Sequence, residues 1–272
     1  MLPKIKVVGV GGSGSNTISR IRRFGIVGVE LISVTTDAQA LHFAKADKKI
    51  LIGKNTTMGL GAGMDISQGK KACEENSEEI REALKDSDMV FITCGLGGGT
   101  GSGAGPVISE ISKNLGILTI AVVTTPFSFE GEERKNIAKK AIENLKGKVD
   151  SLIVISNDKL LKIIDEKTTV SNAFLMCDDI LKQAVLGITD LILAPGIISI
   201  DFASIVSIMK GAGHALFGTG KAQGENRATE AATKAINSPL LDFSIKGSKG
   251  VLFNVYGNDV NLNEIKTAAN GL

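Results

Sequence analysis

Gly95-Leu-Gly-Gly-Gly-Thr-Gly-Ser-Gly-Ala-Gly105 contains seven glycines in eleven residues. The apolar run Met89–Cys94 precedes it, and a helix-like segment follows from near Pro106. This order predicts a strand, a glycine loop and a helix. Because glycine has no Cβ, such a loop can turn several backbone N–H groups onto one anion, and the N-terminus of the helix adds its own N–H groups. The stretch therefore predicts a polyphosphate-binding loop rather than a linker or an ordinary tight turn.

Length and composition limit the class of protein. The chain has 272 residues and a formal net charge of +2, with acidic and basic residues mixed along it. One tyrosine, no tryptophan and no basic stripe argue against a nucleic-acid partner. The apolar runs are strand-sized and no signal peptide is evident, so we expect a cytoplasmic protein without direct membrane insertion. Three widely spaced cysteines suggest no metal site.

Two further glycine-rich loops repeat the same plan. Gly9-x-Gly11-x-x-Gly14 follows the short apolar strand 5–10, and the loop 53–63 precedes a charged amphipathic helix predicted from Ser67 to about Lys85. In a doubly wound sheet, loops of this kind converge at the carboxyl ends of the strands. One nucleotide with several phosphates could therefore contact all three loops.

The first of these loops also matches the fingerprint of dinucleotide-binding enzymes. Asp37 follows the next strand, near where such enzymes place a ribose-binding acid. An NAD-binding oxidoreductase is therefore an alternative on this evidence. A Walker-type phosphate loop is excluded, because the chain contains neither Gly-Lys-Ser nor Gly-Lys-Thr.

Beyond residue 117 the predicted loops carry carboxylate, amide and guanidinium groups instead of glycine. These groups follow the predicted strands 117–124 and 150–155 and suit a ribose or a base edge. Apolar residues then recur at helical spacing from Val170 to Leu193, which predicts a long buried helix. Further on we expect a strand at 214–219, a helix at 225–236 and a strand at 250–256.

The chain resembles the tubulin and FtsZ family, and bacterial-type FtsZ in particular. Gly97-Gly-Gly-Thr-Gly-Ser-Gly103 is similar to the glycine signature of that family. Supporting segments keep the family's order along nearly the whole chain, at residues 10–16, 36–41, 59–63, 126–131, 157–161, 201–203 and 238–241. The resemblance implies an α/β fold. Its parts would be a Rossmann-like, mostly parallel GTP-binding domain at 1–169, a central helix at 170–193, and a catalytic-loop region with a truncated second α/β domain at 194–272.

The resemblance also implies GTP and GDP as ligands, with Mg2+ carried on the phosphates and no metal ligands from protein side chains. The residues that it assigns to the nucleotide are Gly11, Gly12, Asn16, Ala62, Gly63, Gly97, Gly98, Gly99, Thr100, Gly101, Ser102, Gly103, Pro126, Glu130, Arg134, Asn157, Phe174, Asp178 and Asp179. Ala62 and Gly63 would meet the γ-phosphate, and Gly98 to Gly103 the α- and β-phosphates.

The remaining assignments concern the ribose and the base. Glu130 and Arg134 would hold the ribose side, and Phe174 would stack on the base. Guanine presents ring and exocyclic N–H donors beside a carbonyl acceptor. Asp179 with Asn157 has the complementary chemistry.

In this family a loop of the next subunit, with the pattern Asn-x-Asp-Phe-Ala-Asp, completes the site and orients the attacking water. This chain keeps Asp201 but has Ser199 and Ser204 in place of the Asn and the second Asp. Serine cannot supply the missing negative charge, so we expect hydrolysis to be reduced, on the order of 10²-fold, while binding survives.

The resemblance therefore implies a GTPase that forms a head-to-tail homopolymer in cell division. It further implies partners in the division machinery and a cytoplasmic location at the division site. A weakly hydrolysing or non-hydrolysing FtsZ-like filament or regulatory paralogue is the alternative.

Overall fold

The computed structural model describes residues 2–160, 168–193, 200–238 and 247–271. The chain divides into two compact units, residues 1–215 and 216–272. Each unit is described by itself.

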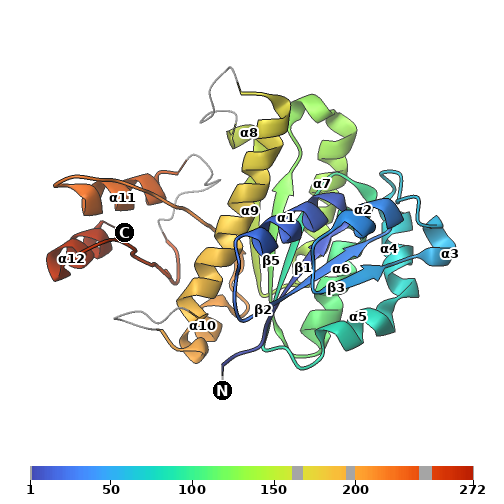
Figure 1. The fold of residues 1–272 in the computed structure, drawn as a ribbon, viewed down its shortest axis with the longest axis horizontal. Coiled ribbons are helices and arrows are strands. Elements are labelled where there is room, and N and C mark those ends of the chain that lie inside the picture. Colours follow the sequence, from blue (N-terminus) through green and yellow to red (C-terminus); the bar gives the residue numbers. More distant parts are fainter. Residues whose placement is uncertain (1, 161–167, 194–199, 239–246, 272) are drawn as a thin grey trace. The chain divides into compact units, whose positions relative to one another are not determined.

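The first unit is built on a parallel sheet that has seven strands within the described residues (Figure 1). The strands are β1 (Ile5–Val10), β2 (Val29–Thr35), β3 (Lys48–Leu51), β4 (Met89–Gly95), β5 (Leu118–Thr125), β6 (Ser151–Ser156) and β7 (Gly213–Ala215). Their order is β3-β2-β1-β4-β5-β6-β7, and each neighbouring pair is parallel. This confirms the predicted α/β class. The chain reverses direction across the sheet between β1 and β4, which is where such folds bind ligands.

Helices cover both faces of this sheet. They are α1 (Gly11–Arg23), α2 (Ala38–Phe43), α3 (Lys54–Thr57), α4 (Ile66–Glu75), α5 (Ser77–Leu84), α6 (Gly99–Asn114), α7 (Glu132–Leu145), α8 (Asn157–Leu160), α9 (Val170–Leu193) and α10 (Phe202–Met209). The helices α1 and α9 pack against each other on one face, and α5, α6 and α7 cover the other. The long central helix predicted from apolar spacing is α9.

One predicted helix is divided in the structure. We expected a single helix from Ser67 to about Lys85, but Asn76 separates α4 from α5. Its side-chain oxygen accepts a hydrogen bond from the N–H of Gly53 at 2.9 Å, and its amide donates to Glu79 Oε2 at 2.9 Å. Asn76 thus joins the start of α5 to the loop after β3, a contact that helical periodicity does not reveal.

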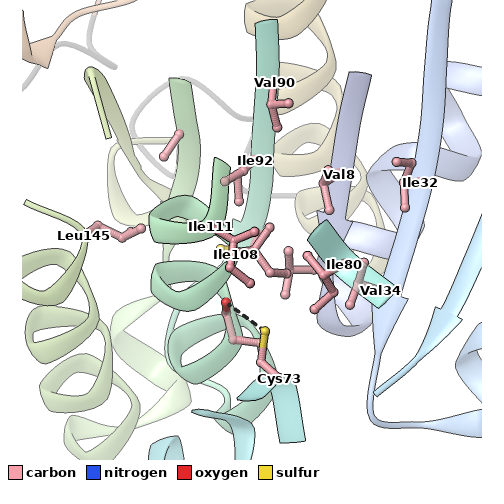
Figure 2. Packing of buried hydrophobic residues seen from close by; sticks show 14 of the residues in the cluster. Val8, Ile32, Val34, Cys73, Ile80, Val90, Ile92, Ile108, Ile111 and Leu145 are labelled. Carbon is pink, nitrogen blue, oxygen red and sulfur yellow. Dashed lines mark hydrogen bonds between the residues drawn. The ribbon is translucent and has the colours of Figure 1, made fainter. Parts of the chain in front are cut away.

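The main core lies between the sheet and the helices α4 to α7. Alternate strand residues, such as Val8, Ile32 and Ile92, pack against Ile80 of α5 and Ile108 of α6 (Figure 2). All of these side chains are almost fully buried, and each contributes about 1.5–3 kcal/mol relative to an exposed position.

Cys73 lies in the same core. Its Sγ donates to the carbonyl of Ala104 at 3.7 Å, and burial raises its pKa to about 12, so it remains a thiol (Figure 2).

The second unit contains α11 (Arg227–Ile236) and α12 (Leu262–Asn270) in its described part. Arg227 joins the two helices through its Nη2, which lies 3.1 Å from Glu264 Oε2. Glu264 also closes a capping box with Asn261 at the start of α12. The hydrogen bonds from Arg227 and Asn261 lower the pKa of Glu264 to about 2.

Two strand predictions near the C-terminus require correction. The strand expected at 214–219 is limited to Gly213–Ala215, and it pairs with β6 in the first unit. The stretch 250–256 forms no ladder with any described strand, and Val251, Phe253 and Tyr256 are exposed. Its residues favour a strand, but β propensity cannot supply the neighbour whose backbone groups a strand must bond.

No helix within the described ranges is long and apolar enough to cross a bilayer.

Candidate functional site

Two helix N-termini meet at the carboxyl ends of β1 and β4. The helix α1 begins at Gly11, immediately after β1, and α6 begins at Gly99, shortly after β4. A Cβ at Gly11 would lie 3.2 Å from the backbone nitrogen of Gly101, so the two helix starts are in direct contact. Gly11 has a φ of +74°, which favours glycine. The first N–H groups of both helices lack partners within their own helix, and their dipoles favour an anion at this point.

The glycines of these loops fall into two groups. A Cβ at Gly12, Gly61, Gly63 or Gly98 would meet no atom of the described residues within 4 Å. The backbone is therefore open on the side where a side chain would otherwise project. A ligand can approach such a backbone closely, which is what a phosphate-binding loop requires. Gly98 is also the N-cap residue of α6.

The second group of glycines serves helix packing. A Cβ at Gly103 would overlap the carbonyl oxygen of Ile66, and a Cβ at Gly99 would lie 2.8 Å from the backbone nitrogen of Asp65. Sequence reasoning missed a third member, Gly69 of α4, where a Cβ would overlap the carbonyl oxygen of Gly99. The helix α4 therefore lies directly on the start of α6.

These contacts explain a difference from prediction. We expected the helix to begin near Pro106, yet α6 begins at Gly99 and includes the second half of the glycine stretch. Glycine is a poor helix former, by about 1 kcal/mol per residue, but close packing of the backbone against α4 and β4 outweighs this preference.

Several predicted contact residues bond to one another within the loop. The N–H of Gly97 donates to Ser102 Oγ at 3.0 Å, and Thr100 Oγ1 lies 2.7 Å from Thr36 Oγ1 at the end of β2. The first bond closes the loop onto the first turn of α6. The second ties α6 to Thr36, whose carbonyl also accepts the N–H of Gly61, so Thr36 connects α6 to the loop 53–63.

Asn16 lies on the exposed side of α1, one helical turn after Gly12. Both residues line an open cleft of about 370 Å³, together with Asp37 of the loop after β2. The Asp37 side chain accepts the N–H of Ala40 at 2.9 Å and so caps α2. Asp37, the residue that suggested a dinucleotide-binding enzyme, therefore serves as the N-cap of α2.

Pro126, Glu130 and Arg134 lie beside the main glycine loop. A Cβ at Gly97 would lie 3.3 Å from Pro126 Cγ and 3.1 Å from the carbonyl oxygen of Arg134. Glu130 Oε1 accepts the N–H of Phe127 at 2.9 Å, and its other oxygen lies 3.5 Å from Arg134 Nη1. The structure thus places this polar group next to the loop, as the sequence order suggested.

Phe174 of α9 belongs to a cluster of three aromatic rings. Its ring and that of Phe127 meet edge to face at a centroid distance of 5.2 Å, and Phe129 stacks on Phe127 at 4.9 Å. Phe127 is fully buried, whereas Phe174 is 40% exposed. Phe127 therefore holds Phe174 in place while part of that ring stays free for a ligand.

The two neighbouring aspartates of α9 have different surroundings. Asp178 is buried against α1, with Oδ2 at 3.1 Å from Arg20 Nε and Oδ1 accepting from Thr17 Oγ1 at 3.4 Å. Burial raises its pKa to about 6, although Arg20 opposes this shift. Asp179 pairs instead with Lys182 at 2.9 Å. Asp178 is thus the carboxylate in contact with the helix that starts at the first glycine loop.

Asn157 follows β6 directly and is buried. Its Oδ1 finds no hydrogen-bond partner within the part of the chain that the structure describes. An unsatisfied buried acceptor costs about 1–3 kcal/mol. This orphaned amide oxygen therefore indicates that a polar ligand group belongs beside it.

Two of the predicted catalytic residues, Asp201 and Ser204, lie elsewhere in the first unit. Asp201 is the exposed N-cap residue of α10, where its Oδ1 accepts the N–H of the exposed Ser204 at 2.8 Å. Hydrogen bonds from the side chain and the backbone of Ser204 lower the pKa of Asp201. Ser199 lies outside the described residues. Helices α8, which follows β6, and α10 lie at opposite ends of α9, so one chain does not bring Asp201 to Asn157 (Figure 1).

Comparisons with known proteins agree with this geometry. A family model described as "Tubulin/FtsZ family, GTPase domain" matches residues 4–165, and one described as "FtsZ family, C-terminal domain" matches residues 213–272. The structure is similar to an empty FtsZ dimer from M. jannaschii, with a TM-score of 0.93, 46% identity, and coverage of 99% of this chain and 79% of that one. A tryptophan-to-tyrosine mutant of M. jannaschii FtsZ gives the same TM-score and identity, with 81% of that chain covered.

A more distant solved structure is also similar. It is CetZ1 from Haloferax volcanii, a GDP-bound monomer, with a TM-score of 0.71 and 25% identity. The match covers 86% of this chain and 74% of that one.

Proposed function

Because this chain belongs to the tubulin/FtsZ family of GTPases, we propose that it binds GTP at the three glycine loops, assembles head to tail, and hydrolyses GTP where two subunits meet. One observation carries this proposal. The phosphate cradle lies where α1 and α6 begin, at the carboxyl ends of β1 and β4, whereas Asp201 caps α10, which lies at the opposite end of α9 from α8 (Figure 1). A second copy must therefore supply the carboxylate, and a heterologous contact of this kind repeats into a filament.

The phosphates would be held mainly by backbone N–H groups. The open glycines Gly12, Gly63 and Gly98 and the N-termini of α1 and α6 support this role. Mg2+ bound to the phosphates would neutralise part of their charge. The described residues include no group of three or more His, Cys, Asp or Glu side chains that could hold a metal ion without the nucleotide.

The base would be recognised between β6 and α9. The exposed part of the Phe174 ring offers a contact surface for the base, and the orphaned amide oxygen of Asn157 requires a polar partner. Asp179 would accept the guanine N–H groups. Its side chain is 47% exposed, whereas Asp178 is buried and both of its oxygens are engaged by Arg20 and Thr17 of α1. We therefore assign the guanine-binding carboxylate to Asp179, and this choice favours guanine over adenine.

Hydrolysis would depend on the way in which α10 presents Asp201. Its carboxylate is exposed, its orientation is fixed by the N-cap bond to Ser204, and its lowered pKa keeps it ionised at neutral pH. Such a group can accept a hydrogen bond from the attacking water and polarise it. Ser204 offers only a hydroxyl at the position where the family has a second carboxylate.

Phosphate release measured against protein concentration tests the proposal. A shared site predicts a specific rate that rises cooperatively with concentration in GTP and Mg2+, and Asp201→Ala should abolish turnover while retaining GTP binding. Activity strictly linear in protein concentration would contradict a site shared between subunits. Calorimetry with GTP, GDP and NAD tests ligand identity, and tight NAD binding would overturn the assignment.

The loss of the second carboxylate at Ser204 favours a second candidate, a filament with weak or no hydrolysis. Electron microscopy with GTP and with a slowly hydrolysed analogue separates the two candidates. Filaments that persist in GTP as long as in the analogue would support weak hydrolysis, and filaments that disassemble only in GTP would support the active enzyme.

A cytoplasmic role in cell division, together with division-machinery proteins, completes the proposal. A fluorescent fusion that failed to gather at the division site would contradict it.

A further inference from the structure

Asp150 joins three segments at the N-terminal end of the sheet. The residue is buried, and its Oδ2 accepts the N–H of Thr119 at 2.9 Å while its Oδ1 accepts the N–H of Gly211 at 3.3 Å. Its backbone N–H donates to the carbonyl of Thr119 at 2.8 Å, and its carbonyl accepts the N–H of Gly213 at 2.9 Å. The Asp150 carboxylate thus connects the start of β5 to the turn between α10 and β7.

Ser151 makes a second connection to the same turn. Its Oγ donates to the carbonyl of Met209, the last residue of α10, at 2.7 Å, and this bond is buried. Ile205 and Met209 are the buried residues of α10. The C-terminal end of α10 is therefore fixed to the sheet by two adjacent side chains at the start of β6.

The other end of α10 carries Asp201. The helix has eight residues, so its two ends are about 12 Å apart. The carboxylate of Asp201 is oriented by its bond to the N–H of Ser204, which belongs to the helix itself. Its position is therefore only as well defined as that of the helix. Among the described residues, the side-chain hydrogen bonds that fix the C-terminal end of α10 to the sheet come from Asp150 and Ser151.

We infer that Asp150, with the assistance of Ser151, is a positioning residue for hydrolysis. It holds α10 so that Asp201 reaches the nucleotide of the adjacent subunit. This inference rests on the proposed function, since it requires Asp201 to act on a neighbour. Asp150 would act in the subunit that supplies Asp201, not in the subunit that binds the nucleotide. It gives Asp150 no part in the nucleotide pocket, because the glycine loops lie at the carboxyl ends of the strands and Asp150 lies at the opposite end.

The first experiment compares Asp150→Ala with Asp88→Ala in the full chain. Asp88 is a control for the same bonding pattern at an exposed position. Its Oδ2 accepts the N–H of Lys4 at 2.7 Å and its own N–H donates to the carbonyl of Lys4 at 2.9 Å, at the same end of the sheet. The described contacts of Asp88 do not include α10. Asp150→Ala should lower the turnover number by about tenfold or more with GTP affinity nearly unchanged, and Asp88→Ala should change neither. Unchanged turnover in Asp150→Ala would overturn the inference.

If Asp150→Ala fails to fold, Ser151→Ala replaces it. This variant removes a single hydroxyl and should reduce turnover by a smaller factor. Turnover equal to that of the wild type in this variant would likewise overturn the inference.

A mixing experiment separates positioning from general damage. Asp150→Ala, or Ser151→Ala in its place, is mixed in equal amount with Gly98→Val, whose side chain would project into the phosphate cradle while its own Asp201 stays intact. Where a Gly98→Val subunit supplies Asp201 to the pocket of an Asp150→Ala subunit, both the nucleotide pocket and the correctly positioned carboxylate are intact. In a random filament such interfaces amount to about a quarter of the total, so activity should recover toward that fraction of the wild-type value.

Asp201→Ala mixed with Gly98→Val in the same way serves as the reference. Recovery with both variants supports the inference. Recovery with Asp201→Ala but not with Asp150→Ala means that the Asp150→Ala substitution damages the nucleotide pocket of its own subunit. That result overturns the inference but leaves the shared site in place. No recovery with Asp201→Ala overturns the shared site, and the inference falls with it.

Discussion

Gly69 of α4 packs with its Cα directly against the carbonyl group of Gly99 at the start of α6. A Cβ at Gly69 would overlap the carbonyl oxygen and lie 2.8 Å from the carbonyl carbon. The helix α4 follows the loop 59–63, and Asp65, its N-cap residue, donates its N–H to the carbonyl of Ala62 at 2.9 Å. Two phosphate loops that lie far apart in the sequence therefore meet through a contact between backbones.

Gly69→Ala should separate these loops. We expect a loss of about 1–3 kcal/mol in the free energy of unfolding, and a larger loss of affinity for GTP than for GDP, because Ala62 and Gly63 are assigned to the γ-phosphate. Gly105→Ala on α6 is the control, since its Cβ would lie an ordinary 3.5 Å from Cys94 Sγ. Urea unfolding and calorimetry measure both effects. Equal losses of affinity for GTP and GDP would contradict the proposed link between the loops.

Gly98→Ala should affect binding but not folding. The backbone at Gly98 has φ −99° and ψ 166°, which any residue can adopt, and a Cβ there would meet no described atom within 4 Å. We expect an unchanged unfolding midpoint and GTP affinity lower by about tenfold or more, because the methyl group would occupy the approach of a phosphate. Gly99→Ala should instead lower the unfolding midpoint, because a Cβ there would lie 2.8 Å from the backbone nitrogen of Asp65. Full GTP affinity in Gly98→Ala would remove this loop from the site.

The raised pKa of Asp178, about 6, predicts that nucleotide affinity depends on pH. Protonation of Asp178 would weaken its ion pair with Arg20, which joins α9 to α1, so affinity for GDP should fall as the pH drops below about 6. Asp178→Asn should bind more weakly at pH 7 and lose this dependence. Calorimetry of both proteins between pH 5 and 7.5 tests the prediction, because titration of the phosphates affects both equally. Identical pH profiles would contradict it.

The same group has the opposite effect on the stability of the nucleotide-free protein. Its pKa is higher in the folded chain than the value of 3.8 for an ordinary aspartate, so the folded state binds the proton more tightly. The stability from this proton is present below pH 4 and is lost as the pH rises through about 6, with an upper limit of about 3 kcal/mol. Unfolding of the wild type and Asp178→Asn across this range measures the difference. A wild type that gains stability relative to the variant as the pH rises from 4 to 6 would contradict the assignment.

Ser204→Asp should increase hydrolysis. Ser204 is exposed in the first turn of α10, where the helix dipole favours an added carboxylate. We expect phosphate release to rise by about tenfold or more at unchanged GTP affinity. Ser207→Asp, one turn further along the same helix, is the control and should give no increase. If Ser204→Asp binds GTP and assembles without faster turnover, the missing carboxylate does not limit the reaction.

Local patterns in the sequence were sufficient for the type of fold and for the strands and helices that carry the candidate site. The apolar runs before each glycine loop predicted β1 and β4, and helical spacing predicted α9. The break at Asn76 could not be predicted in this way, because it depends on a bond to Gly53, which is 23 residues away. The stretch 250–256 shows the reverse case, since its composition favours a strand but it pairs with no strand among the described residues.

The glycine stretch itself shows how the information divides. Its composition alone predicted a loop that binds phosphates, because the absence of Cβ atoms is a property of each residue. Only the tertiary structure separates Gly98, which is open, from Gly103, which is covered by α4, because that difference depends on which distant backbone lies against each Cα. The same reason applies to Asp178 and Asp179. They are adjacent in the sequence, but only Asp178 meets Arg20, which belongs to a helix more than a hundred residues earlier in the chain.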